Sequence, residues 1–100
     1  MTELQQFFGC YFHQDWDLSS SSDQEAIQQY LNDSDLHSIE KSAKELRSLI
    51  VRKITENQLD ELITSTYKCS FDPNSNGSTY IEWITTMHAT FYDLIRKHRG

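Results

Sequence analysis

Residues 72–77 come closest to a metal-binding motif in this chain of 100 residues. A calcium-binding EF-hand loop takes ligands from positions 1, 3 and 5 and has glycine at position 6. Those positions correspond here to Asp72, Asn74, Asn76 and Gly77. The twelfth position, normally a bidentate Glu, is Trp83, and Glu82 comes one residue early, which on a helix turns its carboxylate by about 100°. We therefore predict a capped Asx turn, with a calcium-responsive helix pair as the alternative.

Two further groupings could do chemistry but lack the remaining parts of a site. His13, Asp15 and Asp17 would form a metal cluster only on an extended strand, where alternate side chains point the same way. Cys10 and His13 lie one helical turn apart, without a third orienting group at a recognisable spacing. The sequence has no nucleophile elbow, P-loop or dinucleotide-binding motif. We expect no enzyme activity, no metal and no cofactor.

Charge is divided unevenly along the chain. Residues 1–40 hold eight Asp and Glu and no Lys or Arg, whereas residues 41–100 hold nine Lys and Arg and seven Asp and Glu. The net charge of −6 therefore comes from the first part of the chain. A segment of one sign repels nucleic acid and anionic membranes and attracts a basic partner. The alternative is an acidic surface that serves only solubility.

Cysteine content and hydropathy indicate in which compartment the protein resides. Cys10 and Cys69 are too few for a disulfide scaffold, and we expect two free thiols whose small side chains are buried. No apolar run approaches the roughly 20 residues that cross a membrane. The first residues lack the basic and apolar regions of a secretion signal. We therefore expect a cytoplasmic protein.

Five of the twelve aromatic residues fall within ten positions, namely Phe7, Phe8, Tyr11, Phe12 and Trp16. Of these, Phe8, Tyr11 and Phe12 follow the i, i+3, i+4 spacing of one helix face. A face of large rings is too costly to leave in water, so it should anchor the core. Gly9 inside this helix costs about 1 kcal/mol relative to alanine. We expect a neighbouring helix or the Trp16 ring to approach it closely.

The pattern F-F-x-x-Y-F-H-Q-D-W-D, followed by an acidic helix, resembles the helical immunity proteins of bacterial contact-dependent growth inhibition systems. The specific resemblance ends near Leu31, and beyond it only length and helical pattern are similar. It implies a cytoplasmic inhibitor that forms a 1:1 complex with the C-terminal domain of one toxin, and many such toxins are nucleases. It also implies an architectural role for the shared run, from which we select Phe8, Tyr11, Phe12, His13, Gln14 and Trp16.

A nuclease presents a basic cleft to phosphate, so an acidic inhibitor surface can occupy that cleft and speed association. We therefore expect a basic toxin domain as partner, and neither nucleic acid nor membrane. The expected contact residues are the acids Asp15, Asp17, Asp23, Glu25, Asp33 and Asp35. Asp15 is the acid for which a structural role competes most strongly, and Tyr30 joins the set if its ring is exposed. The alternative function is a small acidic helical adaptor with a non-toxin partner.

Apolar residues at helical spacing predict an all-α fold, with residues 1–100 forming one small domain as a bundle of about five helices. The expected helices span 2 or 3 to 12 or 13, 23 to about 31, 36 to about 54, 55 to about 69, and about 80 to 99. Capping pairs mark three starts, Ser22–Glu25, Thr55–Gln58 and Thr79–Glu82. The bases of the third helix, Arg52 and Lys53 included, should form a solvated face that complements the helix dipole and does not meet the toxin.

Overall fold

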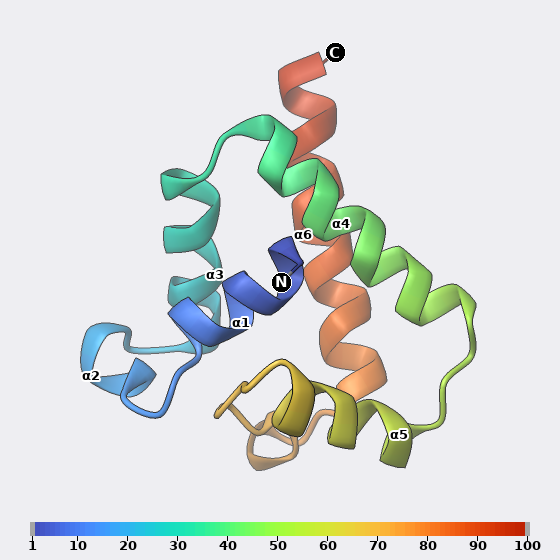
Figure 1. Ribbon diagram of the computed structural model, residues 1–100. Coiled ribbons are helices and arrows are strands. Elements are labelled where there is room, and N and C mark those ends of the chain that lie inside the picture. Colours follow the sequence, from blue (N-terminus) through green and yellow to red (C-terminus); the bar gives the residue numbers. More distant parts are fainter. Residues whose placement is uncertain (1, 100) are drawn as a thin grey trace.

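The helices begin at capping residues in the computed structural model, which describes residues 2–99 (Figure 1). In chain order the elements are α1 Glu3–Tyr11, α2 Trp16–Ser19, α3 Asp23–Asp33, α4 Leu36–Val51, α5 Glu56–Glu61, η1 Leu62–Thr66, η2 Pro73–Asn76 and α6 Tyr80–Arg99. The π-helical η1 continues α5 directly, and η2 is a 3-10 turn. Residues 2–99 contain no strand, so the predicted all-α fold is confirmed. Within the same range, no helix combines the length and apolarity needed to cross a membrane.

Two of the predicted capping pairs form completely. Ahead of α5, the Gln58 N–H donates to Thr55 Oγ1 and the Thr55 N–H donates to Gln58 Oε1, both at 3.2 Å. Ahead of α6, Thr79 and Glu82 make the same pair of bonds at 3.1 and 2.9 Å. Each box satisfies backbone donors that the first helical turn leaves without partners. The starts of α5 and α6 therefore follow directly from local sequence.

Two predicted helix ends and one predicted connection are wrong. The helix expected over 55 to about 69 ends at Thr66, with η1. α4 ends at Val51 instead of near Ile54, because Lys53 has a left-handed φ of 56°, which a right-handed helix cannot continue. The sequence predicts that Arg52 and Lys53 add positive charge to the last turn of this helix, but both lie beyond its end. The connection over residues 13–22 is not simply a turn either, since it contains the short helix α2, which begins at Trp16.

Phe7 of α1 lies at the centre of the core. Its ring is fully buried, and its centroid lies within 6.0 Å of the ring centroids of Phe8, Tyr11, Phe12, Tyr30 and Phe91. Those rings belong to α1, the segment just after it, α3 and α6. Figure 1 shows α1 lying between α3 on one side and the crossed helices α4 and α6 on the other. One aromatic side chain thus connects three of the helices.

Two acids from the C-terminal part of the chain hold the starts of distant helices. Glu56, at the start of α5, accepts hydrogen bonds from the backbone N–H groups of Tyr80 and Ile81 at 2.6 and 3.1 Å. Glu45 of α4 accepts one from the Leu4 N–H at 3.4 Å. A carboxylate at a helix N-terminus satisfies unpaired donors and lies at the positive end of the helix dipole. These bonds fix α5 against α6 and α4 against α1.

The structure contradicts the close approach expected at Gly9. A Cβ placed on Gly9 would meet no atom within 4 Å beyond its chain neighbours and its own helix backbone. Gly9→Ala should therefore raise the free energy of unfolding by about 1 kcal/mol, because alanine loses less backbone entropy in a helix. Urea denaturation measures this change, with Gln6→Ala at an exposed site of α1 as a control that should shift stability by less than about 0.5 kcal/mol. A Gly9→Ala protein no more stable than the parent would contradict the prediction.

The two cysteines are both free but differ in exposure. Cys69 is buried as predicted, and burial raises the pKa of its thiol to about 12. Cys10 is exposed, so the prediction that both thiols are buried is wrong for Cys10. A disulfide reagent such as DTNB should modify one thiol rapidly in the native protein and the second only on unfolding, because reaction needs an accessible thiolate. Cys10→Ser should abolish the rapid phase, and two rapid phases in the parent would contradict this assignment.

Candidate partner-binding surface

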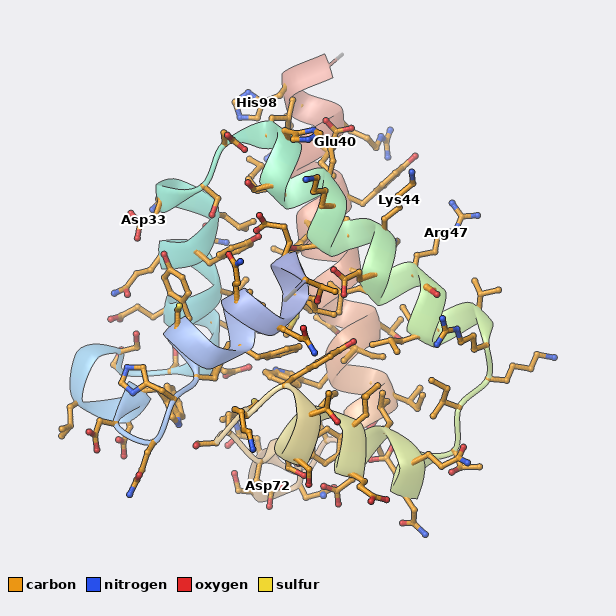
Figure 2. All side chains as sticks on the ribbon, in the orientation of Figure 1. Asp33, Glu40, Lys44, Arg47, Asp72 and His98 are labelled. Carbon is orange, nitrogen blue, oxygen red and sulfur yellow. The ribbon has the colours of Figure 1, made fainter. Side chains whose placement is uncertain are left out.

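The predicted contact acids belong to α2, α3 and the residues that flank these helices, and α2 and α3 form one edge of the molecule. In Figure 1 this edge lies on the side away from the turn between α4 and α5. Figure 2 shows Asp33 pointing outward from it, whereas Lys44 and Arg47 of α4 point to the other side. Five of the acids are exposed and Asp23 is half-buried. We use the term acidic edge for the surface that carries Asp15, Asp17, Asp23, Glu25, Asp33 and Asp35.

The tip of the acidic edge is the short helix α2. Asp15 and Asp17 are exposed there. Leu18, which follows Asp17 in the chain, is 83% exposed, more than any other large apolar side chain among the described residues. The tip is held in place by Trp16, whose ring packs edge-on against Phe71 with centroids 5.4 Å apart. An apolar side chain beside carboxylates is suited to an interface with a charged rim. Leu18 leaves no signal in the sequence, because a single leucine in a polar turn follows no helical period.

Asp33 is placed against the electrostatics of its own helix. It ends α3, whose last turn has no basic residue, and the helix dipole disfavours a carboxylate there. The Tyr11 hydroxyl donates a hydrogen bond to Asp33 Oδ2 at 3.0 Å. Burial, together with this bond, raises the pKa of Tyr11 to about 12, so the phenol remains a donor near neutral pH. The hydrogen bond ties α1 to the end of α3, and the carboxylate of Asp33 is still exposed.

Two other acids of the edge, Asp23 and Asp35, also hold the fold together. Trp83 Nε1 donates a hydrogen bond to Asp23 Oδ2 at 3.0 Å, which ties α3 to α6. Asp35 caps α4 by accepting a hydrogen bond from the Ser38 N–H at 2.8 Å, and the bonds from Ser38 lower the pKa of its carboxyl group. Substitution of either acid would therefore alter folding and binding together. Asp15 and Asp17 are better positions for testing binding alone.

Glu25 lies at the start of α3, where the predicted capping box is only half formed. Its N–H donates to Ser22 Oγ at 3.2 Å, as expected. Its carboxylate instead accepts a hydrogen bond from the Ser21 hydroxyl at 2.7 Å. The side chain is exposed, and the N-terminal end of the helix dipole favours its negative charge. Glu25 therefore presents its carboxylate on the acidic edge.

Tyr30 does not belong to the acidic edge. Its side chain is 4% exposed, and its ring stacks on Phe91 with centroids 5.7 Å apart and an interplanar angle of 26°. Its hydroxyl shares a 2.6 Å hydrogen bond with the buried Ser42 hydroxyl, and burial raises the pKa of Tyr30. The exposed ring on which its inclusion depended is absent, so we withdraw Tyr30 from the candidate contacts. It joins α3 to α4 and α6 in the core.

The run from Phe8 to Trp16 forms the scaffold beneath the edge. Phe8 stacks on Tyr67 with centroids 5.6 Å apart, and Phe12 lies 5.5 Å from Trp16, whose ring is half-buried. The chain then turns at His13, whose Nδ1 accepts a hydrogen bond from the Asp15 N–H at 3.1 Å. These contacts place Phe8, Phe12 and Trp16 in the aromatic packing, and the architectural role of the run as a whole stays a prediction. Gln14 is exposed, and its structural role stays a prediction.

The loop at 72–77 is the capped Asx turn that the sequence predicts. Asp72 Oδ1 accepts a hydrogen bond from the Asn74 N–H at 3.0 Å, and Gly77 ends the turn with a φ of 79°. The Glu82 carboxylate is directed at the Thr79 N–H, in the capping box of α6. Within the described part of the chain, no group of three or more His, Cys, Asp or Glu is arranged to hold a metal ion. The carboxylates of Asp72 and Glu82 thus both accept hydrogen bonds from backbone N–H groups, one in the turn and the other at the start of α6.

Comparison with known proteins connects these features to a family. A family model described as CdiI immunity protein matches residues 1–91. A crystal structure of a CdiA-CT/CdiI complex from Y. kristensenii contains a chain with the same fold, at a TM-score of 0.84 and 18% sequence identity. The alignment covers 89% of this chain and 95% of that one. No curated protein sequence gives a match.

Proposed function

The chain belongs to the CdiI immunity protein family, whose members neutralise toxins by binding and are not enzymes, and we propose that it does so through its acidic edge. In this proposal the partner is the C-terminal domain of one cognate toxin, bound in a 1:1 complex in the cytoplasm. The toxin domain is basic, as expected of a nuclease that must bind phosphate. Residues 1–100 act together as one inhibitor domain.

The observation that carries the proposal is the position of the exposed carboxylates. Asp15, Asp17, Glu25, Asp33 and Asp35 are all exposed on one edge, although they come from a segment of 21 residues that the fold could have distributed around the molecule. No lysine or arginine occurs in residues 1–40 to neutralise them. Such a surface attracts a basic domain over several ångströms and speeds its association, by about 10- to 1,000-fold in favourable cases.

The acidic edge also offers an apolar contact at its tip. Charges at the rim of an interface mainly set the association rate, whereas a desolvated apolar side chain at its centre slows dissociation. Leu18 is the side chain at the tip that can take the second role, with Asp15 and Asp17 beside it. Trp16 fixes α2 on the aromatic scaffold, so the tip loses little conformational freedom on binding.

Co-expression with the toxin domain encoded upstream of this gene tests the function. The proposal expects growth to be rescued, and expects the purified complex to have the mass of one toxin domain plus one copy of this chain. Neither result is expected of a helical adaptor with a different partner. Failure of rescue together with the absence of a complex would overturn the assignment to that toxin.

The nature of the toxin is tested separately with the purified domain. If it is a nuclease, it degrades RNA or DNA, and one molar equivalent of this chain stops the reaction. Rescue of growth from a toxin that cleaves neither nucleic acid would preserve the immunity function and overturn the nuclease assignment. A partner domain with no excess of basic residues would remove the electrostatic basis of the proposal.

A further inference from the structure

The positive charge of the molecule is concentrated on the pair of helices α4 and α6. Four of the seven acids in residues 41–100 direct their carboxylates at backbone N–H groups as helix or turn caps, namely Glu45, Glu56, Asp72 and Glu82. Of these acids only Glu45 belongs to the middle of α4, and its carboxylate is directed at the start of α1; none of the four lines the groove between α4 and α6. Where lysines and arginines of this region line the α4–α6 surface, nearby acids therefore neutralise only part of their positive charge.

A groove of about 920 Å³ runs between α4 and α6. This volume lies within the range of about 300–1,000 Å³ that is typical of ligand-binding clefts. Five lysines and arginines contribute to its lining, against the two acids Glu40 and Asp93, and these bases are Lys41, Lys44, Arg47, Arg96 and Lys97. Figure 2 shows Lys44 and Arg47 projecting from α4 on the side away from Asp33. We call this feature the α4–α6 groove, and it does not include any residue of the acidic edge.

The α4–α6 groove combines these charges with apolar surface. Ala43 and Ile95 line it, together with Tyr92, which is 50% exposed and stacks on His88 with ring centroids 6.0 Å apart. Burial, and next the nearby Arg47, lowers the pKa of His88, which disfavours the charged imidazolium. The positive charge of the groove thus comes from lysine and arginine at its rims, with aromatic and aliphatic carbon between them.

We propose that the α4–α6 groove is a second interaction surface, which binds an acidic amphipathic helix of a protein other than the toxin. The apolar face of such a helix meets the exposed ring of Tyr92, and its carboxylates meet the bases of the two rims. A nucleic acid fits less well, because the two acids in the lining interrupt the track of positive charge that a phosphate backbone needs. This inference rests on the proposed function in one respect: the toxin is taken to occupy the acidic edge, which shares no residue with the groove, although Lys41 of the groove lies near enough to Asp35 to lower its pKa.

A synthetic peptide of about 16 residues, with leucines at i, i+3, i+4 and i+7 and glutamates elsewhere, is a suitable probe. It is titrated against the full chain by isothermal calorimetry and by amide chemical-shift mapping. Lys44→Glu/Arg47→Glu should weaken its binding about tenfold or more. Arg52→Glu/Lys53→Glu is the matched control, since it changes net charge equally at exposed positions outside the groove and should leave most of the affinity.

Two further arms decide between the possible ligands. Tyr92→Ser should weaken binding of the peptide, and a single-stranded RNA oligonucleotide of equal charge should bind the groove more weakly than the peptide does. Lys44→Ala/Arg47→Ala serves in place of the double reversal if that variant is unfolded. The proposal is overturned if the peptide does not bind, if groove and control variants bind it equally, or if RNA is the tighter ligand. Asp15→Lys/Asp17→Lys should not weaken peptide binding, which separates this test from that of the acidic edge.

Discussion

Phe7→Ala is expected to lower the free energy of unfolding by about 3–5 kcal/mol, the usual cost of deleting a fully buried aromatic ring. The Phe7 ring contacts rings on α1, α3 and α6, so its removal leaves a cavity where three helices meet. It also forfeits aromatic pair contacts, which are worth about 0.5–1.5 kcal/mol each beyond area burial. A domain of this size has a total stability of about 5–15 kcal/mol, so the variant should lose a large fraction of it.

Urea and thermal denaturation, followed by circular dichroism, measure this loss. Leu18→Ala is the matched control, because it removes a large apolar side chain that is 83% exposed, and it should change stability by less than about 0.5 kcal/mol. A cost below about 1 kcal/mol for Phe7→Ala would show that the core closes around the gap and that Phe7 is not its centre.

Asp15→Lys/Asp17→Lys should slow association with the toxin domain by about tenfold or more at low ionic strength, since it reverses the field of the acidic edge at its tip. Both carboxylates are exposed, so the free protein should keep its stability. The difference from the parent should shrink as salt is added, because screening shortens the range of the interaction to about 8 Å at physiological ionic strength. Stopped-flow fluorescence or surface plasmon resonance measures the association rate.

Glu61→Lys/Asp93→Lys is the matched control for this variant. It produces the same change in net charge at two exposed positions on α5 and α6, away from the acidic edge. Its association rate should fall far less than that of Asp15→Lys/Asp17→Lys. Equal slowing in both variants would mean that net charge matters and the edge does not, and an unchanged rate in both would rule out electrostatic steering.

Much of the fold could be predicted from local sequence. The capping boxes of Thr55 and Thr79 predict the starts of α5 and α6, because the donor and acceptor lie only three residues apart. The aromatic spacing of Phe8 and Phe12 predicts the buried face of α1, since helical period and burial are directly linked. The sequence also indicates the separation of charge: five exposed acids of residues 1–40 belong to the acidic edge, and five bases of residues 41–100 line the α4–α6 groove.

The features that could not be predicted depend on contacts between distant segments. The burial of Tyr30 is decided by Ser42 and Phe91, and neither lies near it in sequence. α2 forms because Trp16 packs on Phe71, and a four-residue helix has no periodicity to detect. The α4–α6 groove arises where two helices cross that α5, η1 and η2 separate in the chain, so its lining is not continuous in sequence.

The most direct test of the acidic edge is to locate the toxin on the surface of the protein. Amide hydrogen exchange, measured by mass spectrometry on the free chain and on the 1:1 complex, reports which backbone segments the toxin covers. If the toxin binds the acidic edge, amide exchange should slow over residues 15–18 and 23–35, and the exchange rates of the α4–α6 groove should stay unchanged. Slowed exchange confined to α4 and α6, with residues 15–35 as in the free chain, would contradict it.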